Sequence, residues 1–209
     1  MTSRNMEMEI KNKKLFARGK RGIVSTAFLG RKKVAIKEKR FSSKAEFAIE
    51  KEAEWLKIFN THDIGPKFLY FNDGQLIYEF VEGEYLVDFL PKASRKDALS
   101  ILKNVLMQCR KLDELGINKF EMTRPRKHVI VSKKRNKLLA TMIDFERCRR
   151  TERPKNVTQF CQFLISAEMQ LFLAGKNIKI ERHSMISLAQ KYKSNQTRNN
   201  FAKIAGTLK

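Results

Sequence analysis

Cysteine and acidic residues are scarce in this chain of 209 residues. The three cysteines, Cys109, Cys148 and Cys161, are odd in number and widely spaced, so neither a disulfide framework nor a zinc site is indicated. No stretch resembles a signal peptide, and no apolar run has the length that a membrane span needs. We therefore expect reduced thiols and a cytoplasmic protein without a membrane partner.

Basic side chains outnumber acidic ones two to one, because 44 Lys and Arg face 22 Asp and Glu and leave a formal net charge of +22. Most of the excess lies in residues 1–40, with 13 basic and 3 acidic side chains, and in residues 119–155, with 13 and 4. If the fold brings these segments together, the resulting positive face would attract nucleotide phosphates, RNA or an acidic protein. A basic surface without a dedicated partner is the alternative.

Three runs typical of short antiparallel strands occupy residues 15–37. The first two surround a turn that contains Gly19 and Gly22, and a second turn at residues 30–32 leads into Val34-Ala35-Ile36-Lys37. A glycine-bearing hairpin lets backbone N–H groups approach phosphate oxygens, although most such pairs of glycines are ordinary turns. The third run matches the strand motif whose lysine pairs with the α- and β-phosphates of ATP in protein kinases. An exposed lysine at a strand end is the alternative.

Residues 43–59 predict an amphipathic helix. Ser43 and Glu46 have the spacing of a capping box at its start. An apolar stripe at helical spacing follows, and it consists of Ala45, Ala48, Ile49, Leu56 and Phe59.

One acid, Glu52, lies on that apolar stripe. An acid on a buried face needs a cation, and Lys37 is the candidate, because the pair would hold the lysine in place and keep it charged. Glu50 and Glu54 compete for this role if the helix is rotated. A solvated helix face is the alternative for each acid.

Residues 67–81 predict a hairpin, because the dipeptide Asp73-Gly74 separates two apolar runs. Glu82-Gly83 then breaks the second strand. If the protein has two lobes, the chain passes from one lobe to the other at this point. The backbone from Glu79 to Val81 would then meet an adenine edge.

Asp144 ends the mostly apolar run 138–143, which suits a strand that is covered on both faces. An acid at the end of such a strand lies where the strand meets solvent or a ligand. A surface or helix-capping aspartate is the alternative. Residues 94–115, ended by Gly116, predict a long helix whose apolar repeat belongs to the core.

A polar loop at residues 117–128, a strand at 129–131 and a turn at 133–136 precede the strand that ends at Asp144. A basic stretch, residues 147–155, follows that strand. Three helices are then expected, at residues 157–174, 182–193 and 196–206.

Taken together, these motifs resemble the protein-kinase-like superfamily, and the compact size is similar to that of its small atypical members, the RIO kinases and the KEOPS-complex kinase. More narrowly, residues 121–128, 143–148 and 156–160 look like an archaeal family of predicted Ser/Thr kinases. The resemblance covers about residues 15–175.

The resemblance implies an α+β, protein-kinase-like two-lobed fold. Residues 1–81 would form the nucleotide-binding N-lobe, a small antiparallel sheet with one helix, and residues 82–209 a reduced, mainly helical C-lobe. The implied function is that of an ATP-dependent phosphotransferase, an atypical serine/threonine protein kinase that uses Mg-ATP and has a protein substrate.

The resemblance also implies a role for each candidate residue. Lys37 would hold the α- and β-phosphates, Glu52 would orient Lys37, and Asp144 would bind Mg²⁺. Glu121 would accept or orient the substrate hydroxyl, and His128 would assist the metal or the γ-phosphate. The remaining nucleotide-binding candidates are Gly19, Gly22, Glu79 and Val81.

Several positions depart from the kinase pattern. The His-Arg-Asp catalytic loop is absent, so Glu121 is the candidate for the role of its aspartate, whereas strict spacing would put Thr123 there. His128 stands where an asparagine normally binds metal, and a neutral imidazole is a poor ligand for Mg²⁺, so a packed or hydrogen-bonded histidine is the alternative. Glu146 replaces the glycine of the Asp-Phe-Gly motif.

Two rival functions follow from these departures. One is a catalytically weak pseudokinase or ATPase that acts as an RNA- or ribosome-associated basic binding protein. The other is a kinase for a small molecule or an RNA-associated target. The sequence does not name the substrate.

Overall fold

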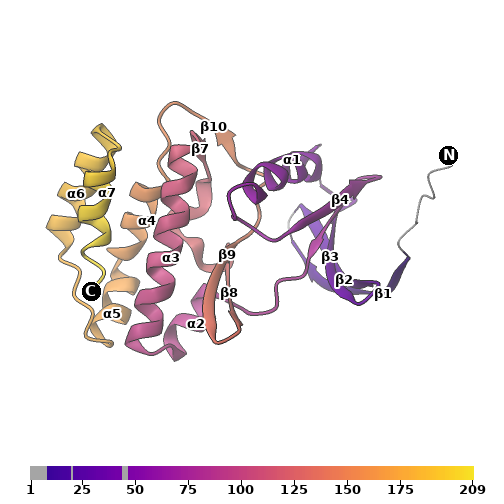
Figure 1. The fold of residues 1–209 in the computed structure, drawn as a ribbon, viewed down its shortest axis with the longest axis horizontal. Helices are drawn as coiled ribbons and strands as arrows, with labels where there is room; N and C mark the ends of the chain where they lie inside the picture. The colour runs from indigo at the N-terminus through magenta and orange to yellow at the C-terminus, as the bar shows by residue number, and fades with distance from the viewer. Residues whose placement is uncertain (1–8, 20, 44–46) are drawn as a thin grey trace. The chain divides into compact units, whose positions relative to one another are not determined.

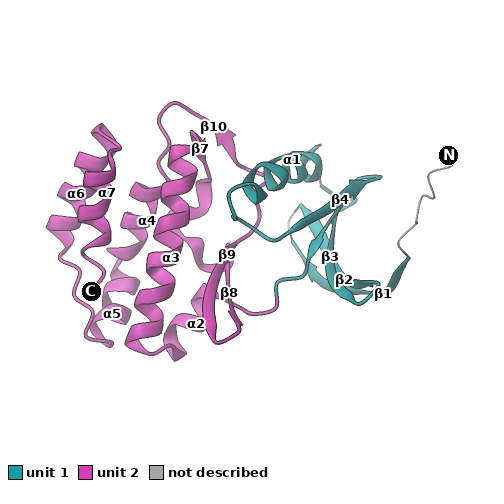
Figure 2. Ribbon diagram, viewed as in Figure 1, with its two compact units in different colours: residues 1–81 teal, residues 82–209 magenta. Residues whose placement is uncertain are grey.

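The computed structural model describes residues 9–19, 21–43 and 47–209. The chain divides into two compact units, unit 1 with residues 1–81 and unit 2 with residues 82–209 (Figure 2). It combines an antiparallel sheet with seven α-helices in the described part, which confirms the α+β class. None of the described helices has the length and apolar character needed to cross a membrane.

Unit 1 is built on one five-stranded antiparallel sheet with the order β1-β2-β3-β5-β4 (Figure 1). Its core is made by small and branched side chains of the central strands, among them Val34, Ile36 and Ile77. The three strands expected within the first 40 residues are confirmed. The strands are β1 (Ile10–Arg18), β2 (Gly22–Leu29), β3 (Lys32–Lys39), β4 (Phe68–Asn72) and β5 (Gln75–Glu79).

The helix of unit 1, α1 (Ala48–Asn60), packs against β3, β4 and β5. Its buried face confirms the predicted stripe from Ile49 onward. The helix begins five residues later than expected, after Phe47, which has the left-handed φ of 57°. Glu46 of the expected capping box and Ala45 of the stripe lie outside the described residues.

The Asp73-Gly74 hairpin is confirmed. Both residues have positive φ, 47° and 72°, as a two-residue turn between twisted antiparallel strands requires. The side chain of Asn60 connects the end of α1 to this hairpin, because it accepts from Phe68 N at 2.6 Å and donates to Pro66 O at 2.9 Å. The end of α1 is thereby fixed against the edge strand β4.

Unit 2 is mainly helical, and α3, α4, α6 and α7 run side by side in it (Figure 1). A three-stranded antiparallel sheet, β6-β8-β9, and a short pair, β7-β10, complete it. The elements are β6 (Glu84–Tyr85), α2 (Leu86–Lys92), α3 (Arg95–Glu114), β7 (Ile117–Asn118), β8 (Val129–Lys134), β9 (Lys137–Met142), β10 (Arg149–Arg150), α4 (Asn156–Leu164), α5 (Ala167–Ala174), α6 (Arg182–Ser194) and α7 (Arg198–Ala205).

The segment expected to form one helix over residues 157–174 forms two, α4 and α5, so that prediction is wrong. Ser166 causes the break, because its hydroxyl donates to Phe163 O at 2.8 Å and accepts from Met169 N at 3.4 Å. The serine thus ends one helix and caps the next. The short helix α2 was not expected.

Strand β9 is not covered on both faces, which corrects the expectation for the run before Asp144. Ala140 and Met142 are buried, whereas Leu139 is 39% exposed and Lys137 is also exposed. The reason is that β9 is an edge strand that packs one face against α3. The side chain of Gln108 in α3 donates to Ala140 O at 2.7 Å.

A buried carboxylate connects three helices of unit 2. Asp113 in α3 accepts from the backbone N–H groups of Asn156 and Val157, from the Asn156 amide and from the Tyr192 hydroxyl in α6. Burial raises the pKa of the Asp113 carboxyl, and these hydrogen bonds act in the opposite direction. Arg110 donates to the same Tyr192 oxygen at 2.7 Å. The N-terminus of α4 is therefore capped by α3.

None of the three cysteines forms a disulfide bond in the described part of the chain, which agrees with the expected thiols. Burial raises the pKa of the Cys109 thiol and raises that of Cys161 to about 12. Both thiols stay protonated at neutral pH and are poor nucleophiles.

Gly83 allows the start of unit 2 to pack against β8. A Cβ atom at this position would lie 2.2 Å from the carbonyl oxygen of Val131 and 2.9 Å from a methyl carbon of Ile130. We expect Gly83→Ala to lower the free energy of unfolding by about 1–3 kcal/mol, because backbone must move to relieve this overlap. Urea unfolding measures the change.

Gly175→Ala is the matched control, because its Cβ would find only ordinary contact, 3.5 Å from Phe172 O, at a helix end with φ of −61°. Equal stability of the two variants would contradict the close packing at Gly83.

Candidate functional site

Unit 1 contains a buried ion pair between a strand and a helix. The ammonium of Lys37 in β3 donates to the carboxylate of Glu52 in α1. Their side chains are 11% and 5% exposed, so water screens the attraction only weakly. The predicted pairing is confirmed, whereas Glu50 is only partly buried and Glu54 is exposed.

Gly22 lies directly against Lys37. A Cβ atom at Gly22 would be 3.1 Å from the carbonyl oxygen of Glu38 and 3.4 Å from Cε of Lys37. A side chain at this position would therefore crowd the Glu38 carbonyl oxygen in β3, whereas Lys37 Cε stays at an ordinary contact distance. The glycine is needed for the close approach of the β3 backbone beside Lys37.

The N–H of Gly19 is engaged within the β1-β2 hairpin. It donates to the carbonyl oxygen of Gly22 at 2.8 Å and so closes the β1-β2 turn. A Cβ at Gly19 would meet only an ordinary contact, 3.4 Å from the same oxygen.

The backbone at the end of β5 is partly engaged. The N–H of Glu79 donates to Lys67 O at 2.8 Å, and the N–H of Phe80 donates to Lys33 O at 3.1 Å. The Glu79 carboxylate lies 3.5 Å from the ammonium of Lys32. Val81 takes part in no hydrogen bond with the described residues of unit 1, so within that unit its backbone is available to a ligand.

Unit 2 contains a second buried lysine, Lys119, in the loop between β7 and β8. Its side chain is fully buried, and the ammonium donates to Ile143 O at 2.8 Å, to Asp144 O and to the carboxylate of Glu121 at 3.3 Å. It also lies 5.0 Å from the centre of the Phe145 ring. One ammonium thus connects the loop that carries Glu121 to the segment that carries Asp144.

Sequence reasoning missed Lys119. It is one of 44 basic residues, and no local pattern marks it as buried. Its burial depends on long-range contacts with residues 143–145, which the local sequence does not reveal.

Glu121 is the second residue of the 3-10 turn Phe120–Thr123, and its side chain lies between two cations. Its carboxylate lies 3.3 Å from Lys119 Nζ and 3.6 Å from Arg147 Nη1, with the side chain 11% exposed. Thr123, which strict spacing would favour for the same role, is exposed. The structure therefore gives Glu121 the better defined environment of the two.

Asp144 has an unusual backbone for a residue with a side chain, with φ of +65°. A left-handed conformation at a non-glycine residue costs about 1–3 kcal/mol and tends to occur at functional sites. Ile143 N donates to His128 O at 3.0 Å, and Lys119 donates to the carbonyl oxygen of Asp144, so the neighbouring contacts hold this conformation.

The carboxylate of Asp144 lies beside two other candidates. Its Oδ2 is 3.7 Å from Nδ1 of His128, and one of its oxygens lies within 4.8 Å of a carboxylate oxygen of Glu146. In phosphoryl-transfer sites Mg²⁺ is bound by one or two carboxylates together with phosphates and waters. Asp144 and Glu146 fit this donor set, whereas the imidazole of His128 is a poor ligand for Mg²⁺.

The structure thus brings the candidates together in two groups. Unit 1 places Gly22, Lys37 and Glu52 in contact, and unit 2 places Glu121 and Asp144 around Lys119, with His128 beside Asp144.

No protein-family model matches the chain, and no curated protein matches it. The resemblance to the protein-kinase-like superfamily rests on the motifs quoted above and stays a prediction.

Lys119→Met tests the role of the buried ammonium. We expect the free energy of unfolding to fall by about 2–4 kcal/mol, because the substitution keeps most of the volume but removes the cation from two carbonyl oxygens and a carboxylate. Urea unfolding followed by circular dichroism measures this change. The control is Lys127→Met, which removes an exposed ammonium from the same loop. If both variants unfold at the same urea concentration, Lys119 is not the anchor described above.

Proposed function

We propose that the chain is an ATP-dependent phosphotransferase, an atypical serine/threonine protein kinase that uses Mg-ATP and has a protein-kinase-like two-lobed fold. The observation that carries this proposal is the buried pair of Lys37 and Glu52. A lysine held by a helix acid, beside a glycine that keeps its surroundings open, is the arrangement that phosphoryl transfer uses to hold nucleotide phosphates.

The nucleotide would be held mainly by unit 1. Lys37 offers an ammonium to the α- and β-phosphates, and Glu52 keeps that ammonium in one orientation. Gly22 leaves room for the phosphates beside the lysine. The backbone groups of Val81, which form no hydrogen bond with the described residues of unit 1, would bind the adenine edge, whereas the N–H of Glu79 is already engaged with Lys67.

The catalytic groups would come from unit 2. Asp144, with Glu146, would hold Mg²⁺, which neutralises phosphate charge when it is bound. The carboxylate of Glu121 would accept the proton of the substrate hydroxyl as its oxygen bonds to the γ-phosphorus and the bond to the leaving ADP oxygen breaks. Lys119 would position both acids, because it binds the Glu121 carboxylate and the Asp144 backbone.

Transfer of labelled γ-phosphate into a cell extract tests the proposal. We expect Asp144→Asn and Lys37→Arg to lower the rate by about 100-fold or more, because each changes a charge that phosphoryl transfer needs in a fixed geometry. Lys37→Arg keeps a cation beside Glu52 but replaces the ammonium by a planar fork, so the pair survives and the phosphate contact does not.

Asp88→Asn and Lys39→Met, both at exposed positions, are the matched controls and should transfer phosphate at the wild-type rate. Full activity in the Asp144 variant would exclude the proposed mechanism. Nucleotide binding without transfer in the wild type would instead favour the pseudokinase. Separating protein, RNA and metabolite fractions of the extract identifies the acceptor.

Gly22→Ala tests the glycine beside Lys37. We expect it to raise the KM for ATP by about tenfold, because the added methyl, 3.1 Å from Glu38 O, shifts the β3 backbone next to the lysine that holds the phosphates. Gly19→Ala, in the same turn, should leave the KM within a factor of about two, since its Cβ meets only an ordinary contact. Steady-state kinetics over a range of ATP concentrations measures both, and equal effects would show that the crowding at Lys37 is irrelevant.

A further inference from the structure

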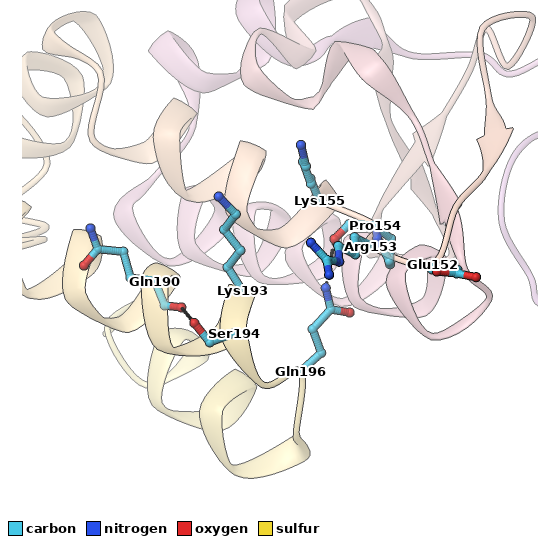
Figure 3. A pocket seen from close by; sticks show the side chains of 8 residues that line it. All are labelled: Glu152, Arg153, Pro154, Lys155, Gln190, Lys193, Ser194 and Gln196. Carbon is cyan, nitrogen blue, oxygen red and sulfur yellow. Dashed lines mark hydrogen bonds between the residues drawn. The ribbon is translucent and has the colours of Figure 1, made fainter.

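Unit 2 has an open groove of about 780 Å³ between the chain that leads into α4 and the C-terminal end of α6 (Figure 3). None of the candidate nucleotide or metal residues lines it. Its walls are polar and basic, and they include the side chains of Arg153, Lys155, Gln190, Lys193, Ser194 and Gln196.

Three cations that have no acidic partner in the described part of the chain line the groove. Arg153, Lys155 and Lys193 are all exposed, and no ion pair involves any of them in the described part of the chain. Lys155 and Lys193 extend in the same direction from opposite walls, whereas the carboxylate of Glu152 points away from both (Figure 3). The groove therefore carries a positive potential that attracts an anion.

The walls of the groove are held in place by hydrogen bonds. The side-chain amide of Gln196 donates to Pro154 O at 2.8 Å, and the backbone carbonyl oxygen of Gln196 accepts from Arg110 at 2.8 Å. On the other wall, Lys155 N donates to Asn118 Oδ1 at 2.9 Å. A preformed groove loses little entropy on binding, so its cations act without prior reorganisation.

The basic surface continues along the chain that enters the groove. Arg147, Arg149 and Arg150 are exposed in the segment just before Arg153. The guanidinium of Arg149 lies 4.5 Å from the centre of the Phe120 ring, which presents a flat cation on an aromatic support. Bases stack on such surfaces, and an occupant that contacts both the groove and this segment must be a long polyanion.

We propose that this groove, together with the arginine segment that precedes it, binds the phosphodiester backbone of a single-stranded nucleic acid. Single strands are bound by positively charged grooves that follow the backbone and by flat side chains on which bases stack. The exposed side-chain amide of Gln190 adds N–H donors for phosphate and sugar oxygens, whereas the Ser194 hydroxyl donates to Gln190 O at 3.2 Å. An acidic protein would use the charge but not the stacking surface.

Fluorescence anisotropy with the full chain tests the proposal. The probes are a labelled oligouridylate and a labelled oligothymidylate, each of about 12 nucleotides. We expect the variant Arg153→Glu, Lys155→Glu, Lys193→Glu to bind oligouridylate about tenfold or more weakly, with the slope of log K against log salt smaller by about 2, since each lost phosphate contact on a single strand removes about 0.7.

The matched control carries Lys96→Glu, Lys103→Glu and Lys179→Glu, three exposed lysines outside the groove, and has the same net charge. It should bind within about threefold of the wild type, because loss of distant charge is largely screened at physiological salt. Urea unfolding of both variants verifies that they fold.

Three results would overturn the proposal: no binding by the wild type, an equal loss of affinity in the control, or displacement of oligouridylate by a polyglutamate peptide at equal concentration. A preference for oligouridylate over oligothymidylate would identify RNA as the source of the backbone, and the reverse preference would identify DNA.

Discussion

The buried ammonium of Lys119 is the constraint on which the candidate catalytic part of unit 2 depends. A lysine without exposed surface must bond all three of its protons, and it does so with two consecutive carbonyl oxygens and the carboxylate of Glu121. These bonds define where the 117–128 loop stands relative to Asp144. The left-handed backbone of Asp144 persists because its carbonyl oxygen is one of the acceptors.

Unit 1 also contains a lysine that an acidic side chain holds in place, here across a strand and a helix. Its buried lysine, Lys37, is held by Glu52 from the helix packed on the sheet. In a chain with half as many acids as bases, the few buried acids decide which cations are ordered. Lys37 and Lys119 are ordered, whereas Arg153, Lys155 and Lys193 remain exposed and available to an anion.

Local patterns predicted much of this structure. The acid on the apolar stripe of α1 indicated a buried partner, and Asp73-Gly74 indicated a hairpin, because in both cases neighbouring residues alone determine the feature. The long helix α3 followed from its apolar repeat and the glycine after it, and Gly116 indeed has φ of +65°.

The predictions that failed depend on contacts between distant segments. The exposure of Leu139 results from the edge position of β9, and the break at Ser166 depends on a hydroxyl whose capping role its sequence neighbours do not reveal. The burial of Lys119 and the groove beside α6 arise only when residues far apart in the chain pack together. Sequence patterns therefore identified most of the site candidates but not the cation that connects two of them.

The proposed phosphotransferase function requires that one bound nucleotide contacts both Lys37 and Asp144. The most direct test is nuclear magnetic resonance of the labelled chain with a non-hydrolysable ATP analogue and Mn²⁺, whose unpaired electrons broaden the signals of nearby nuclei. If one nucleotide contacts both residues, the amide signals of Gly22 and Lys37 and those of Asp144 and Phe145 will broaden together in the same complex. Broadening confined to one of these two groups would contradict it.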